Sequence, residues 1–110
     1  MKMGLDLLAE AAFENASNKG FHDGKDFTSI EWQLSKIALI HSEGSEVLEA
    51  LRKEQGEYKV VEEIADILIR TLDFYHSLKT GSVVTSSLDE VYDAKANKNK
   101  TRPRMHGVLA

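Results

Sequence analysis

The chain has 110 residues, one proline, no cysteine and a net charge of −4. This length indicates a single domain over residues 1–110, and the lack of cysteine excludes disulfides, thiolate metal sites and a cysteine nucleophile. Because no apolar stretch approaches the roughly 20 residues of a membrane span and acids interrupt the N-terminal apolar run, we expect a cytoplasmic protein without membrane segment or signal peptide.

The hydrophobic pattern is helical along the whole chain and predicts an all-α fold of four helices. A first helix is expected over residues 5–17, ending at Lys19-Gly20, which is a typical C-terminal signal. A second helix, capped by Asp26 or Thr28, is expected to continue to Glu54.

A third helix is expected over residues 58–79, and a fourth, capped by Ser86 or Ser87, over residues 88–100. The end of the fourth helix is basic and contains no acid. A duplex-binding protein needs a broad basic face, which an acidic body with one basic segment lacks, so nucleic acid is not an expected partner. The basic residues are Lys95, Lys98, Lys100, Arg102 and Arg104.

Two pairs of carboxylates, Glu43 with Glu46 and Glu63 with Asp66, stand three residues apart, so each pair projects from one helix face. At about 100° per residue, Glu43 falls inside the apolar face of its helix, where an ionised carboxylate is costly unless it is paired or ligates a metal. Glu49, in contrast, fits a stripe of solvated acids on the surface of the helix. A hairpin of the two helices would unite both pairs in an all-oxygen cage, which favours Mg²⁺ or Mn²⁺ over Zn²⁺.

The third helix also allows an ordinary interpretation when it is considered alone. Its polar sector is then a solvated face in which Arg70 pairs with Glu63 or Asp66. The rest of this helix is apolar over an arc wider than one packing partner covers, which predicts a subunit interface in a homo-oligomer. His22 falls in a predicted loop, where a solvated histidine is the favoured interpretation.

The segments that carry these acids resemble the MazG-like all-α nucleotide pyrophosphohydrolases, whose pattern is E-E-x-x-E followed by E-x-x-D. The similar segments are residues 40–51 and 62–73. Residues 15–21 resemble the end of the family's first helix, and residues 95–103 resemble its K-x-x-x-N-x-x-R segment. One position departs from the pattern, because Ser42 stands where many members carry the first glutamate.

The resemblance implies a Mg²⁺-dependent enzyme that hydrolyses a nucleoside triphosphate to the monophosphate and pyrophosphate, assembled as a tetramer of two dimers. It implies metal-binding and catalytic roles for four carboxylates and contacts with substrate for six other residues. The alternative for the basic members of the second group is that they are cations favoured near a helix C-terminus. The alternative for its aromatic members is that they belong to the core. The first group is Glu43, Glu46, Glu63 and Asp66, and the second is Asn15, Phe21, Trp32, Lys95, Asn99 and Arg102.

Two other interpretations of the sequence remain open. The chain is either a relative that acts on a narrower substrate, such as dUTP, dCTP or phosphoribosyl-ATP, or a non-catalytic helical interaction module whose acids form only salt bridges. The metal cage is common to all the enzymes, so it does not separate their substrates. The position of Glu43 argues against the interaction module.

Overall fold

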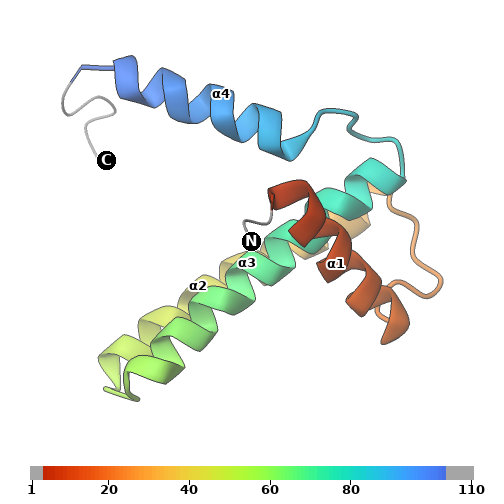
Figure 1. The fold of residues 1–110 in the computed structure, drawn as a ribbon. Helices are drawn as coiled ribbons and strands as arrows, with labels where there is room; N and C mark the ends of the chain where they lie inside the picture. The colour runs from red at the N-terminus through yellow and green to blue at the C-terminus, as the bar shows by residue number, and fades with distance from the viewer. Residues whose placement is uncertain (1–3, 104–110) are drawn as a thin grey trace.

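The computed structural model describes residues 4–103 and consists of four α-helices (Figure 1). The predicted all-α class and number of helices are confirmed, and the described residues contain no strand. Within this part of the chain, no helix is long and apolar enough to cross a membrane. Arg104 lies outside the described residues. The helices are α1 (Leu5–Asn18), α2 (Ile30–Arg52), α3 (Glu57–Thr80) and α4 (Leu88–Thr101).

The start of α2 differs from the sequence prediction. Ser29 is the N-cap, because its hydroxyl accepts a hydrogen bond from the backbone N–H of Trp32. Asp26 instead accepts hydrogen bonds from the backbone N–H and the hydroxyl of Thr28, at 2.9 and 2.6 Å. Since the Asp26 carboxylate is engaged in this turn, it does not cap the helix, and α2 begins a few residues later.

The α2 and α3 helices form a long hairpin, and α1 packs against α3 (Figure 1). Gly56 closes the hairpin with φ +98°, a conformation that side chains with a Cβ rarely adopt. The short turn at this glycine places α2 beside α3 along most of their lengths, so polar residues from both helices can meet in the seam between them.

Few apolar residues are buried within the described chain. Among residues 4–103, only Ala9 and Ala50 are fully buried apolar residues, whereas several large side chains on α2 and α3 are more than half exposed. Exposed apolar area on this scale is a feature of surfaces that associate with another molecule. The exposed residues on these two helices include Leu34, Leu48, Leu51, Val61 and Leu68.

The first turns of α1 and α4 cap each other. Asp89 of α4 accepts hydrogen bonds from the backbone N–H groups of Leu5 and Asp6, at 2.7 and 3.1 Å. Asp6 in turn accepts hydrogen bonds from the hydroxyl of Ser87 and the N–H of Leu88, at 2.6 and 2.9 Å. The hydrogen bond from Ser87 holds the pKa of Asp6 well below its usual range. This exchange satisfies otherwise free N–H groups and fixes the start of α4.

Replacing Asp6 with alanine is expected to lower the free energy of unfolding by about 1–2 kcal/mol at pH 7, because the N–H of Leu88 and the hydroxyl of Ser87, the N-cap residue of α4, lose their acceptor. The folded-state pKa of Asp6 lies below the unfolded value, so its stabilisation is present above the usual 3.8 and declines as the pH falls further. Urea unfolding at pH 7 and pH 3 should therefore show a smaller difference from wild type at pH 3. Asp93→Ala on α4 is the control, and an equal effect of Asp6→Ala at both pH values would contradict this account.

Candidate metal centre

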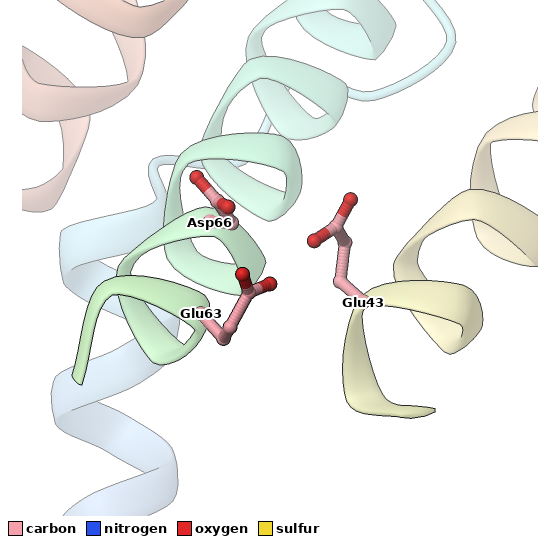
Figure 2. A group of neighbouring side chains, drawn as sticks. All are labelled: Glu43, Glu63 and Asp66. Carbon is pink, nitrogen blue, oxygen red and sulfur yellow. The ribbon is translucent and has the colours of Figure 1, made fainter. Parts of the chain in front are cut away.

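Three of the four predicted carboxylates converge in the seam between α2 and α3. Glu43 points from α2 toward Glu63 and Asp66 on α3, as Figure 2 shows, and oxygens of the three groups lie within 4.8 Å of one another. Glu63 is buried, while Glu43 and Asp66 are half-buried. The three-residue spacing on α3 turns Glu63 and Asp66 to one side, and the hairpin brings Glu43 opposite them.

Glu46, the fourth predicted ligand, is exposed and does not belong to this carboxylate cluster. Its negative charge nevertheless acts on Lys59 of α3, together with the charge of Glu62. The hydrogen bond to Glu63 is the main cause that raises the pKa of Lys59. Glu46 therefore contributes to the negative potential at the edge of the cluster.

Two cations of α3 balance the cluster. The Nε of Arg70 donates a hydrogen bond of 2.7 Å to Glu43, whose side chain is only 13% exposed, and the Nζ of Lys59 lies 2.8 Å from an oxygen of Glu63. The sequence interpretation paired Arg70 with an acid of its own helix, but the side chain crosses to α2. A carboxylate inside a helix interface needs such a partner, because burying its charge alone is costly.

The donor set of the cluster fits a hard divalent cation. Mg²⁺ binds oxygen ligands at about 2.1 Å, which places neighbouring ligand oxygens roughly 3–4 Å apart. The oxygens of the cluster lie within 4.8 Å of one another, which is close to this spacing. Three carboxylates without nitrogen or sulfur donors favour Mg²⁺ or Mn²⁺. Binding would exchange the ion pairs of Arg70 and Lys59 for a metal ion.

A pocket of about 160 Å³ adjoins the carboxylate cluster and contains two of the predicted substrate residues. Asn15 and Phe21 line it from α1 and the turn that follows, while Asp66, Arg70 and Asp73 line it from α3. Phe21 is 65% exposed, so its ring is available to stack on a ligand. Because Asp66 also belongs to the cluster, a ligand in this pocket would lie directly beside the carboxylates.

Trp32 does not line this pocket. Its ring lies 5.0 Å from Phe27 and 5.9 Å from Phe74, measured between ring centroids, and the residue is half-buried. It lines a smaller cavity of about 30 Å³, which shares Arg70 and Asp73 with the larger pocket. These contacts favour the core interpretation of Trp32.

The structure does not bring the basic residues of α4 to the carboxylate cluster of the same chain. Lys95 and Asn99 are exposed on α4, and Arg102 is half-buried directly after it. The main packing contacts of α4 are with α1, and its first residue also donates a hydrogen bond from the Leu88 N–H to Tyr75 of α3. Figure 1 shows the body of α4 standing away from the hairpin. Within one chain, Lys95 and Arg102 fit the alternative role of cations near a helix C-terminus.

A polar group that the sequence did not predict lies beside the pocket. His22, interpreted as a solvated loop residue, has a side chain only 7% exposed, and its Nε2 lies 3.0 Å from Asp73. The hydroxyl of Ser17 lies 2.6 Å from its Nδ1, and the ring stacks on Phe13 at 4.6 Å. Burial raises the pKa of Asp73, although the charge of His22 opposes this effect.

No protein-family model matches the chain, and neither a curated protein nor a solved structure is detectably similar to it. Function is therefore inferred from the carboxylate cluster, from the adjoining pocket and from the sequence resemblance.

Mg²⁺ is expected to raise the midpoint of thermal unfolding, because an ion that binds only the folded chain stabilises it. Glu43→Gln and Asp66→Asn should each abolish this increase but preserve the helical circular dichroism, since a neutral amide relieves repulsion between the acids. Glu49→Gln is the matched control, because Glu49 pairs with Arg52 of the same helix and with Lys53, the residue that follows it. Wild-type stabilisation by Mg²⁺ in both cluster variants would show that the metal site lies elsewhere.

Proposed function

We propose that the chain is a MazG-like, Mg²⁺-dependent pyrophosphohydrolase that converts a nucleoside triphosphate and water to the monophosphate and pyrophosphate. The observation that supports this best is the convergence of Glu43, Glu63 and Asp66 beside a pocket lined by Asn15 and Phe21. Carboxylates that hold Mg²⁺ mostly serve phosphate chemistry, and the exposed aromatic ring is suited to a base. Mn²⁺ fits the same ligands.

Different residues around the cluster would bind the metal ion and the phosphate groups of the substrate. Glu43, Glu63 and Asp66 would hold the metal, and the exposed Glu46 would add negative charge at the edge of the cluster. A divalent ion held by these residues would neutralise phosphate charge and lower the pKa of water bound to it. Arg70 lies between the cluster and the pocket, so its guanidinium can pass from Glu43 to a phosphate oxygen.

Hydrolysis at the α-phosphorus forms one bond to the water oxygen and breaks the bond to the bridging oxygen of pyrophosphate. The products are therefore expected to be monophosphate and pyrophosphate in equal amounts, without a nucleoside diphosphate. In ¹⁸O-labelled water the label should enter the monophosphate, which mass spectrometry measures. Orthophosphate as the first product, or label confined to pyrophosphate, would mean that a different phosphorus is attacked.

We further propose that the enzyme is a homo-oligomer, and the resemblance implies a tetramer built from two dimers. The exposed apolar residues on α2 and α3 support an association between copies of the chain. The position of α4 supports it as well. Lys95, Asn99 and Arg102 lie away from their own carboxylate cluster. At the cluster of a neighbouring copy, Lys95 and Arg102 would neutralise phosphate charge and Asn99 would contact the sugar or a phosphate.

Light scattering at micromolar concentration is expected to give a mass about four times that of the 12.3 kDa chain. Lys95→Ala together with Arg102→Ala should weaken nucleotide hydrolysis, and mixing this variant with Glu43→Gln chains should restore part of the activity. Recovery is expected because each mixed assembly contains some sites with both groups intact. A monomeric mass would contradict the association, and a lack of recovery would contradict shared sites.

The second candidate function is that of a non-catalytic helical interaction module, and one observation favours it. Arg70 and Lys59 already pair with Glu43 and Glu63, as acids that serve only as salt-bridge partners would require. A chain of this kind gains no stability from Mg²⁺ and releases no pyrophosphate. Among the enzymes, a preference for dUTP, dCTP or phosphoribosyl-ATP is tested by assaying each nucleotide for pyrophosphate release.

A further inference from the structure

One buried histidine ties the loop after α1 to α3. The side chain of His22 is only 7% exposed, and its two ring nitrogens have partners on different helices. Nδ1 lies 2.6 Å from the hydroxyl of Ser17, in the last turn of α1, and Nε2 lies 3.0 Å from Asp73 of α3. These contacts form a bridge between the two sides of the 160 Å³ pocket, one lined by α1 and the loop, the other by α3.

The partners of His22 fix the orientation of its ring. An ionised carboxylate only accepts hydrogen bonds, so Nε2 carries the hydrogen and donates it to Asp73. In the neutral ring Nδ1 is then an acceptor, and the hydroxyl of Ser17 donates to it. Phe13 stacks on the ring at 4.6 Å, and Phe27 packs edge-on at 5.3 Å. The imidazole is therefore held both in its plane and at each nitrogen.

The end of α1 places Phe21 beside the pocket. Gly20 adopts φ +84°, and its N–H donates a hydrogen bond of 3.0 Å to the carbonyl of Ser17. The N–H of Phe21 donates a second bond of 3.0 Å to the carbonyl of Ala16, which completes a Schellman helix end. Phe21 and Ala16 both line the pocket. Gly20 thus fixes Phe21 relative to α1, and the bridge through His22 fixes this end of α1 relative to α3.

We propose that His22 is a positioning residue for the pocket, which sets the distance between the Phe21 ring on one side and Arg70 on the other. The inference rests on the proposed function and adds a residue outside its metal and phosphate sites. An apolar ring at position 22 would fill the same space, but it would hydrogen-bond to neither side. Because His22 itself does not line the pocket, its effect on a bound base is expected to pass through Phe21.

A double-mutant cycle tests this coupling with 2-aminopurine deoxyriboside monophosphate, a probe whose fluorescence falls when its base stacks on an aromatic ring. Fluorescence anisotropy gives its dissociation constant. His22→Phe is expected to weaken binding by about 5- to 100-fold, the range for loss of one stacking contact, and to have no further effect in a Phe21→Leu protein. His22→Gln should recover most of the affinity, because its amide can donate to Asp73.

His76→Phe is the matched control, because His76 also contacts the ring of Phe13, at 4.7 Å, but takes no part in the bridge. It should keep the affinity of the wild-type protein for the probe. If His22→Phe does not fold, Ser17→Ala provides the same test, since it removes only the contact of the bridge with α1. This variant should weaken binding roughly 2- to 10-fold, the effect of one neutral hydrogen bond, and again only when Phe21 is present.

Unchanged affinity in the bridge variants, or an equal loss in the Phe21→Leu protein, would show that His22 only packs the core and would overturn the proposal. A wild-type protein that does not quench the probe overturns it as well. The probe contains no anhydride bond, so these outcomes leave the proposed reaction intact. Coupling between His22 and Phe21 without pyrophosphate release from any nucleotide contradicts the proposed reaction alone.

Discussion

The arrangement of this protein depends on one charged side chain placed in a helix interface. Glu43 sits where α2 meets α3, and an ionised carboxylate there is costly unless a partner compensates it. Arg70 supplies that partner from α3, at 2.7 Å. The same contact holds the third carboxylate beside Glu63 and Asp66, so the group that stabilises the hairpin also defines the candidate metal centre. Because the Arg70 side chain is 48% exposed, its ion pair with Glu43 adds little net stability, which is consistent with a functional reason for keeping Glu43 in the interface.

The other features of the site follow from α3, which contributes to each of them. It carries two carboxylates of the cluster and both cations that balance it, and further along it carries Asp73. The α1 helix and its following loop cover this part of α3 and complete the pocket with Asn15 and Phe21. The packing of α1 on α3 therefore determines where the pocket lies. Asp66 connects the pocket to the candidate metal centre because it belongs to both.

The helices and the unusual position of Glu43 could be predicted, because helical periodicity fixes where a residue points on its own helix. Periodicity does not say what lies across an interface, so the crossing of Arg70 to α2 and the exposure of Glu46 were not predictable. The burial of His22 depends on a loop folding back over Phe13, which no local pattern records. The direction of α4 could not be predicted either, because it is set by hydrogen bonds between the first turns of α1 and α4, whose residues lie more than 80 positions apart.

The central claim is that the cluster between α2 and α3 binds a divalent metal. Crystals grown with Mn²⁺ and a non-hydrolysable nucleotide analogue allow the ion to be located by its anomalous scattering. The account predicts a Mn²⁺ peak at about 2–2.3 Å from oxygens of Glu43, Glu63 and Asp66, with Arg70 released from Glu43. Anomalous density absent from this seam, with Arg70 and Lys59 still paired to Glu43 and Glu63, would contradict it.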